Sequence, residues 1–185
     1  MTIIIASNGW IHKSWIDNFY PTDLPEAWRL AYYANEFSAV LVSEEDWLKI
    51  SDNVLEDLLS DVSGDFHFFI AQGQNSSESI KTKIQNGSYE KPVTLIKFNE
   101  NYSASPLGYE FADAEILTSN CVLENSAIIR VSSDNVMELS ELRHMLENAI
   151  EQYVNYQEVY LIFSGRFLEM ATLQSIKALI ELISE

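Results

Sequence analysis

Short apolar runs that alternate with amphipathic helical segments constrain this chain to an α/β fold. Clear runs occupy residues 3–6, 39–42, 66–71, 93–98, 127–131 and 159–163. An alternation of strands with helices is typical of a sheet whose neighbouring strands run parallel. Several runs are apolar at successive positions, which indicates strands that are covered on both faces. No linker, charge block or repeat divides the sequence, so we expect one domain over residues 1–185.

Polar residues place the starts of two helices. Ser43 follows the second run and Asp46 stands three residues later, an arrangement similar to a capping box with Asp in place of Glu. A single helical stripe is predicted to follow, made of Trp47, Ile50, Val54, Leu58 and Val62. Ser133 or Asp134 is predicted to cap the helix between the last two strands.

The net charge of −17 excludes several classes of partner. With 28 acidic and 11 basic residues, the chain repels nucleic-acid phosphates and anionic membrane surfaces. Its densest basic stretch, Lys81, Lys83, Lys91 and Lys97, is diluted by glutamates and is interpreted as a solvated loop. No apolar run approaches the ~20 residues that cross a bilayer. A single cysteine, Cys121, suits a reducing compartment. We therefore expect a cytoplasmic protein that binds neither nucleic acid nor membrane.

Aromatic and turn residues near the start of the chain occur in a recognisable order. They are Ser7-Asn8-Gly9-Trp10, Trp15, Phe19-Tyr20-Pro21, Leu24-Pro25, Tyr32-Tyr33-Ala34 and Phe37. Together they resemble the opening of the YecE-like family (domain of unknown function 72). Residues 128–130, 139–153, 159–163 and 171–182 are similar to the C-terminal strands and helices of that family, whereas residues 73–125 show no such similarity.

This resemblance implies a TIM-barrel-like α/β fold without an established activity. A barrel of eight βα units takes at least ~200 residues, so a chain of 185 residues implies a reduced or irregular barrel with fewer than eight full units. The six clear strands and a doubtful one at 114–117 fit that expectation. The first and last strands must then be hydrogen-bonded neighbours. If the sheet does not close, we expect a second subunit to cover its edges.

The strand ends that usually carry chemistry in a barrel differ from the family pattern. Where the family has a Glu, a Lys, a His and an Asn pair, this sequence has Leu41, Ala71-Gln72, Ser132-Ser133 and Ser164-Gly165. Catalytic residues of barrels lie at these C-terminal strand ends. The resemblance therefore implies a degenerate site and a non-catalytic role in binding or scaffolding.

Arg130 is the most informative polar residue because it ends an apolar strand, where a cation needs a partner. It pairs with a neighbouring acid, or it binds an anion in the barrel mouth. The alternative function is thus an enzyme that acts on a small anionic or sugar-like substrate, using Arg130 and nearby acids. The candidate substrate-binding residues are Trp10, Tyr20, Arg130 and Asp134, with core packing as the other interpretation of the two aromatic residues.

The sequence contains no motif for a cofactor or a metal. His12, His67 and His144 share no ligand-like spacing, and no phosphate-binding glycine motif or nucleophile elbow occurs. We expect no cofactor and no metal, which leaves a small molecule or another protein as the partner. His67 is predicted to point away from Phe66 and Phe68 on its strand, and His144 to face solvent.

Overall fold

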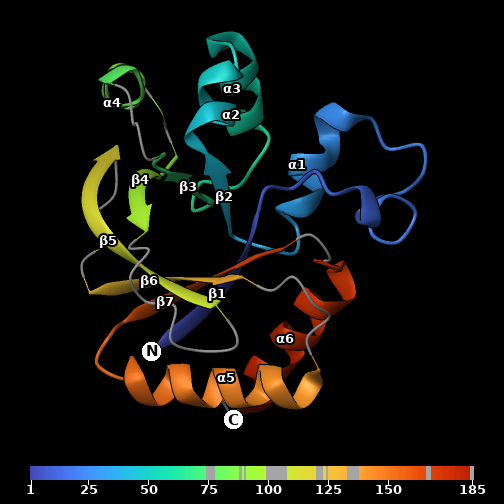
Figure 1. Ribbon diagram of the computed structural model, residues 1–185. Coiled ribbons are helices and arrows are strands. Elements are labelled where there is room, and N and C mark those ends of the chain that lie inside the picture. The colour runs from blue at the N-terminus through green and yellow to red at the C-terminus, as the bar shows by residue number, and fades with distance from the viewer. Residues whose placement is uncertain are drawn as a thin grey trace.

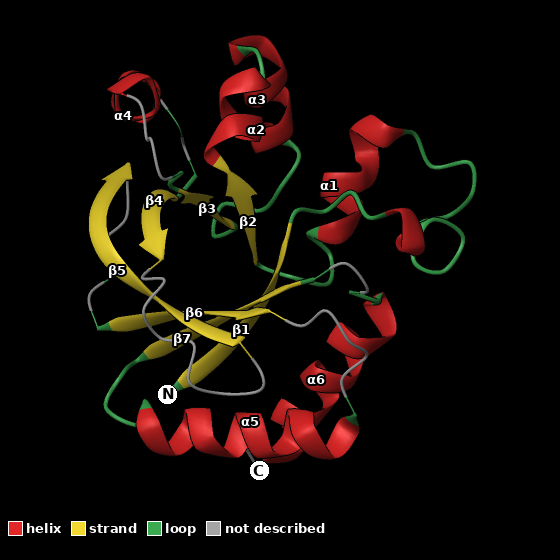
Figure 2. Ribbon diagram, in the orientation of Figure 1, coloured by secondary structure: helices red, strands yellow, loops and turns green. Residues whose placement is uncertain are grey.

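The computed structural model describes residues 1–73, 78–87, 89, 91–98, 108–119, 123, 125–132, 138–165 and 168–183 (Figures 1 and 2). For residues 108–119 the description covers the backbone. Helices surround a curved sheet, and α5 and α6 lie at the opposite side of that sheet from α2, α3 and α4.

The strands of the described residues form a closed barrel, and their order around it follows the chain. They are β1 (Thr2–Asn8), β2 (Ala39–Ser43), β3 (His67–Ala71), β4 (Val93–Phe98), β5 (Gly108–Ser119), β6 (Ser126–Ser132) and β7 (Glu158–Ser164). β1 and β7 are parallel neighbours, with Ile3 opposite Val159 and Ala6 opposite Ile162. This confirms a TIM-like barrel with fewer than eight βα units. The described strands leave no open sheet edge. A second subunit was expected only if the sheet had an open edge.

β5 departs from the predicted parallel arrangement. It runs antiparallel to β4 and to β6, with Leu117 opposite Leu95 and Glu110 opposite Arg130. The predicted strand at 114–117 was therefore too short, and the sequence analysis gave no direction for it. An antiparallel pair needs no crossover helix between its strands, so a reversed strand completes the barrel with fewer residues than a full βα unit.

Helices form the outer layer of the molecule. They are η1 (Lys13–Trp15), η2 (Glu26–Trp28), α1 (Arg29–Tyr33), α2 (Glu44–Lys49), α3 (Asp52–Ser60), α4 (Glu78–Asn86), α5 (Leu139–Gln152) and α6 (Met170–Ile183), where η marks a 3₁₀ helix. Within the part of the chain that the structure describes, none of the helices has the length and apolar character needed to span a membrane.

Alternate residues of β1 to β4, β6 and β7 separate two apolar clusters. The outer cluster lies between sheet and helices and includes Val40, Phe68, Ile129, Leu161, Trp47, Leu146 and Leu173. The inner cluster fills the barrel and includes Ala6, Leu41, Phe69, Ile96, Ile128 and Ile162. Because both faces of the sheet are buried, the strands read as continuous apolar runs, as predicted.

A tyrosine hydroxyl bridges β1 and β2, whose register is only two residue pairs long in the described structure. The N–H of Ser7 donates to the hydroxyl of Tyr33 at 3.1 Å, and that hydroxyl donates to the carbonyl of Ala39 at 3.0 Å. In a regular parallel ladder the two backbone groups would bond to each other directly. We call this arrangement the Tyr33 bridge. Tyr33 is fully buried, so its hydroxyl is enclosed between the two strands.

The predicted stripe over residues 47–62 is split between two helices. α2 ends at Lys49, and Ser51 occupies the N-cap position of α3. The break changes the face that the second helix buries. Leu55 is buried, whereas Val54 is 50% exposed, so the inclusion of Val54 in the stripe was wrong.

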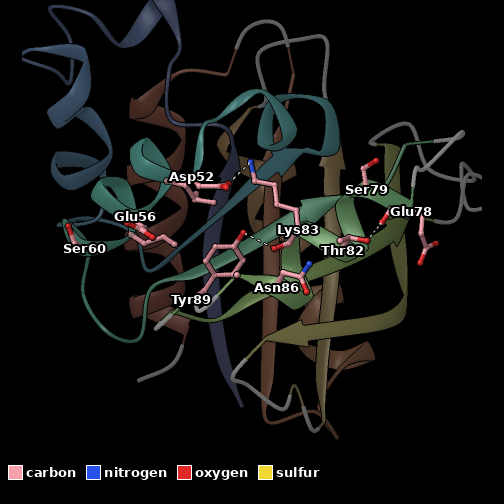
Figure 3. Close-up of a pocket in the computed structure, with 12 residues that line it drawn as sticks. Asp52, Glu56, Ser60, Glu78, Ser79, Thr82, Lys83, Asn86 and Tyr89 are labelled. Atoms are coloured by element: carbon pink, nitrogen blue, oxygen red, sulfur yellow. Dashed lines mark hydrogen bonds and ion pairs between the residues drawn. The ribbon is translucent and has the colours of Figure 1, made fainter.

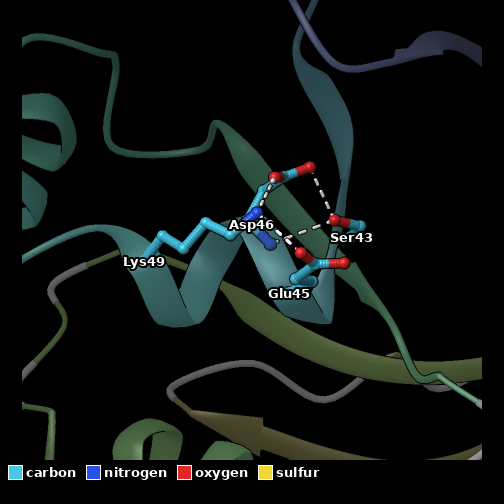
Figure 4. Close-up of polar contacts among 4 residues, drawn as sticks. All are labelled: Ser43, Glu45, Asp46 and Lys49. Atoms are coloured by element: carbon cyan, nitrogen blue, oxygen red, sulfur yellow. Dashed lines mark hydrogen bonds and ion pairs between the residues drawn. The ribbon is translucent and has the colours of Figure 1, made fainter.

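The predicted cap of α2 is confirmed (Figure 4). The Ser43 hydroxyl oxygen accepts the N–H of Asp46 at 3.1 Å and donates to the Asp46 carboxylate at 2.6 Å. The Lys49 ammonium lies 2.7 Å from the Glu45 carboxylate and 3.5 Å from that of Asp46. Acidic residues in the first turn and a basic residue in the last also complement the helix dipole.

Replacing Ser43 with alanine is expected to lower the free energy of unfolding by about 1 kcal/mol, because the N–H of Asp46 loses its acceptor. Glycine at the same position is expected to cost only a few tenths of a kcal/mol. Urea unfolding of both variants checks this. An unchanged free energy of unfolding in Ser43→Ala would show that the hydroxyl does not stabilise the start of the helix.

α5 begins later than predicted. Glu138 is its N-cap residue, and Glu138 and Glu141 form a reciprocal capping box. A glutamate carboxylate has therefore taken the place of the expected serine or aspartate. The prediction that Ser133 or Asp134 starts this helix was wrong, and both residues lie outside the described residues. The buried face of α5 is formed by Leu142, Met145, Leu146 and Ala149.

Candidate functional site

The C-terminal ends of the parallel strands meet at one rim of the barrel, which we call the barrel mouth. The strands end there with Asn8, Ser43, Ala71, Phe98, Ser132 and Ser164. None of these six side chains is an acid or a base. The structure thus agrees with the prediction that the strand ends lack ionisable groups, as far as these residues are concerned.

Arg130 lies on the inner face of the barrel, two residues before the end of β6. Its guanidinium carbon is 4.4 Å from the centre of the Phe98 ring, a distance that gives a favourable cation–π contact. Its register partners are Ile162 on β7 and Glu110 on β5. The position of Glu110 opposite Arg130 fits the ion-pair interpretation. The position of Arg130 near the barrel mouth fits the anion-binding interpretation.

Two hydroxyl groups lie nearer the barrel mouth than Arg130, on the same inner face of the barrel. Ser132 and Ser164 are register partners on β6 and β7, and their hydroxyl oxygens are 2.8 Å apart. Both hydroxyls can donate and accept hydrogen bonds, but an ordinary serine hydroxyl does not ionise near neutral pH.

Glu44 is an acid beside the mouth that the sequence analysis did not identify. It is the first residue of α2 and is 8% exposed, and its carboxylate accepts the N–H of Gly73 at 2.9 Å. Gly73 follows β3 closely, so this bond ties the ends of β2 and β3 together. The only signal in the sequence is an acid in the first turn of a helix, which is common and does not indicate a site.

His12 is a second polar residue near the mouth that sequence reasoning passed over. Its ring lies 4.2 Å from the ring of Trp15, and its Nε2 atom is 3.0 Å from the carbonyl oxygen of Asn8 at the end of β1. Burial lowers the pKa of His12, although the carbonyls of Asn8 and Gly9 oppose this effect. In the neutral ring, Nε2 must carry the proton in order to donate to the Asn8 carbonyl.

Trp10 and Tyr20 lie together in the outer cluster. The hydroxyl of Tyr20 donates to the carbonyl of Trp10 at 2.6 Å, and burial raises the pKa of Tyr20. The ring of Tyr20 packs against those of Trp15, Phe19 and Tyr32. These contacts agree with the core-packing interpretation of both aromatic residues.

The four candidate binding residues therefore do not share one layer of the fold. Trp10 and Tyr20 belong to the outer cluster, whereas Arg130 contacts Phe98 of the inner cluster. Asp134 lies outside the described residues. Their joint role in substrate binding stays a prediction.

The predicted orientations of two histidines are confirmed. His67 points into the barrel, 4.2 Å from the ring of Phe69, with Nε2 2.7 Å from the Thr94 hydroxyl. Phe66 and Phe68 face the other way, into the outer cluster. Burial lowers the pKa of His67 to about 4, so its ring is neutral at pH 7. His144 is exposed on α5.

No three His, Cys, Asp or Glu side chains converge on a metal-sized site within the described ranges. Cys121 lies outside those ranges. A guanidinium packed on an aromatic ring and a hydroxyl pair are groups that bind an anion. They are not the general acid and general base that acid–base catalysis requires.

Comparisons with known proteins agree with the barrel fold. A family model described as "Protein of unknown function DUF72" matches residues 4–108. The chain is also similar to the crystal structure of a DUF72 family protein (TM1631) from Thermotoga maritima MSB8. That match has a TM-score of 0.67 and 11% sequence identity, and it covers 100% of both chains. At this identity the likeness shows the fold alone. No curated protein matches the chain.

Proposed function

The chain belongs to the DUF72 family, and we propose that it is a non-catalytic member that binds a small anionic molecule at the barrel mouth through Arg130. The observation that carries the proposal is the placement of a guanidinium on the inner face of the barrel, against Phe98 and below the hydroxyls of Ser132 and Ser164. The Phe98 ring covers one face of the guanidinium, whose N–H groups point outward in the guanidinium plane. That fork suits the two oxygens of a carboxylate or phosphate.

The non-catalytic part of the proposal follows from the strand ends of the mouth. General acid–base catalysis needs groups whose pKa lies near the working pH, and the strand ends Asn8, Ser43, Ala71, Phe98, Ser132 and Ser164 supply none. Two ionisable groups beside the mouth, Glu44 and His12, are already engaged by backbone groups of Gly73 and Asn8. The alternative, an enzyme for a small anionic or sugar-like substrate, depends on acids such as Asp134. It is favoured only if those acids prove necessary for turnover.

The charge of the whole chain and its cysteine content complete the proposal. A net charge of −17 lowers the concentration of anions near the surface, so selectivity must come from the local geometry around Arg130. The same charge disfavours nucleic acid and anionic membranes as partners. The single cysteine supports a place in the reducing cytoplasm.

Binding is tested by thermal unfolding and calorimetry with a panel of phosphate, citrate and glucuronate. At least one anion is expected to raise the melting temperature, because a ligand at 100 times its Kd adds about 2.7 kcal/mol to the free energy of unfolding. Arg130→Lys keeps the charge but removes the pair of parallel N–H donors. It is expected to lower the affinity for that anion by roughly tenfold or more. The matched control is Arg143→Lys, because Arg143 is exposed on α5 and pairs with Glu147.

Three results would contradict the proposal. The first is that no anion of the panel stabilises the protein. The second is that Arg130→Lys, unfolding cooperatively, binds as tightly as the unaltered chain. The third is that the bound anion is consumed when its NMR spectrum is followed with the protein over a day, which would favour the enzyme instead.

A further inference from the structure

A groove lies on the outer surface of the molecule between α3 and α4, on the side of the barrel occupied by β3 and β4 (Figures 1 and 3). Its volume is about 970 Å³. Each of the two helices has 9 residues, which corresponds to a length of about 13 Å. This α3–α4 groove has no role in the proposed function of the barrel mouth.

The floor of the α3–α4 groove is apolar and held in place. It is lined by Leu55 and Leu59 of α3 and by the ring of Tyr89. The Tyr89 hydroxyl donates to the carbonyl of Lys83 at 3.0 Å. Gly87 makes room for the ring, because a Cβ atom at that position would overlap it. The floor is therefore formed before any partner arrives.

The rim of the groove carries three carboxylates. Asp52 and Glu56 lie one helical turn apart on α3, and Glu78 lies across from them at the start of α4 (Figure 3). All three are exposed. Residues four apart on a helix lie on the same face, so the first two acids form one negative edge and Glu78 contributes to the other.

The cation that lines the groove is already bound by the protein. Lys83 was expected to lie in a solvated loop, but it is on α4 and its side chain is only 15% exposed. Its ammonium donates to the carbonyls of Trp47, at 3.2 Å, and of Ile50, and it lies 3.7 Å from the Asp52 carboxylate. The charge that the groove offers to a partner is therefore negative.

We propose that the α3–α4 groove docks a basic amphipathic segment of a partner protein, about two to three helical turns long. Lys or Arg side chains of that segment would pair with Glu56 and Glu78, and an apolar side chain would contact the floor. Charge complementarity carries the choice of partner. A second copy of this chain is disfavoured, because two molecules of net charge −17 repel each other at an acidic surface.

The mixed apolar and acidic lining of the groove favours a peptide over a small amine. Small-molecule pockets measure roughly 300–1,000 Å³, so the volume of this groove, about 970 Å³, admits either ligand. A linear polyamine would satisfy the carboxylates but would leave most of the apolar floor uncovered. The two ligands therefore differ in whether they need the floor.

The test uses fluorescence anisotropy with a labelled peptide of about 14 residues that places Leu on one helical face and Lys on the other. Saturable binding is expected at about 50 mM NaCl and a clear loss of affinity at about 300 mM NaCl, because salt screens exposed pairs. The double variant Glu56→Gln/Glu78→Gln is expected to bind roughly tenfold more weakly.

Matched controls separate the groove from general acidity. Glu151→Gln/Glu181→Gln removes the same charge from exposed positions on α5 and α6 and is expected to change affinity by less than about threefold. A second pair tests occupation of the groove. Thr82 and Ser175 are exposed hydroxyl residues that each donate to the carbonyl four residues earlier. Thr82→Arg is expected to block binding, and Ser175→Arg is expected to leave it unchanged.

Three outcomes would overturn this proposal. One is equal weakening in the two glutamine double variants, and another is unimpaired binding by Thr82→Arg. The third is that spermine displaces the peptide and binds at least as tightly, which would identify a small polycation as the occupant. Binding of anions at Arg130 is measured separately, so failure here leaves the proposed function of the barrel mouth unaffected.

Discussion

Replacing Tyr33 with phenylalanine is expected to lower the free energy of unfolding by about 2–4 kcal/mol, because two buried backbone groups lose their shared partner. The Tyr33 hydroxyl accepts from the N–H of Ser7 and donates to the carbonyl of Ala39. It also lies 3.0 Å from the Ser7 hydroxyl. Phenylalanine fills the same space without the oxygen, so the packing of the ring is kept and only the Tyr33 bridge is removed.

The position of the Tyr33 bridge adds to the expected cost. β1 and β2 share a short register, so few other backbone hydrogen bonds hold this seam of the barrel together. For a chain of this size, each kcal/mol corresponds to roughly 2–4 °C in melting temperature. We therefore expect a decrease of about 5–15 °C, measured by calorimetry and checked by urea unfolding.

The neighbouring tyrosine is the control for this experiment. Tyr32 is partly buried and its ring packs against Phe19 and Tyr20, but no hydrogen bond of its hydroxyl is found among the described residues. Tyr32→Phe is expected to change the free energy of unfolding by less than about 0.5 kcal/mol. Similar losses in both variants would mean that the bridge does not stabilise the barrel.

Acidification is expected to destabilise the protein through His67 by about 2 kcal/mol between pH 7 and pH 5. Burial lowers the pKa of His67 from 6.5 to about 4. Between these two pH values the unfolded chain binds a proton that the folded chain does not. The stabilisation by neutral His67 is therefore fully present above pH 6.5 and is lost as the pH falls toward 4, where the total loss reaches roughly 3 kcal/mol.

The environment of His67 explains why its charged form is disfavoured. The ring is enclosed by Phe69 and Tyr160 at 4.2 and 5.7 Å, and its Nε2 atom contacts the Thr94 hydroxyl. Among these neighbours none carries a negative charge at pH 5. Protonation would place a cation among aromatic rings inside the barrel, where burial makes the charged form costly.

Urea unfolding at several pH values between 7.5 and 5 measures this effect, within a range that stays above the isoelectric point of about 4.4. His67→Gln is expected to have a shallower decline of stability with falling pH than the unaltered chain, by up to about 1.4 kcal/mol per pH unit. His144→Gln, at an exposed position on α5, is expected to retain the original decline. An unchanged slope in His67→Gln would contradict the assignment.

The barrel was predictable from the sequence where local pattern and tertiary position agree. Residues 3–6 and 159–163 are apolar on both faces because helices cover one side and the barrel interior the other, and their pairing is confirmed. The direction of β5 was not predictable, since the side-chain period of a strand is the same in parallel and antiparallel sheets. The break at Ser51 was missed because one serine within a helical pattern is an equally good surface residue.

The site was less predictable than the fold. That Ser132 and Ser164 carry no acid or base at their strand ends could be read from the sequence, because it depends only on which residues end each strand. Glu44 and His12 were missed, since their importance comes from contacts with Gly73 and Asn8 that arise only when the chain is folded. The α3–α4 groove was missed for the same reason, because it depends on the spacing of two helices that are separated by β3 in the sequence.

The reversed direction of β5 determines which of its residues lies beside the mouth. The family model stops at residue 108, and β5 begins at Gly108. Beyond that point the chain presents the start of a strand, rather than its end, beside the mouth, since Gly108 lies opposite Ser132. Among the described strands, β5 alone therefore contributes its first residue to the mouth, where the other strands contribute their last.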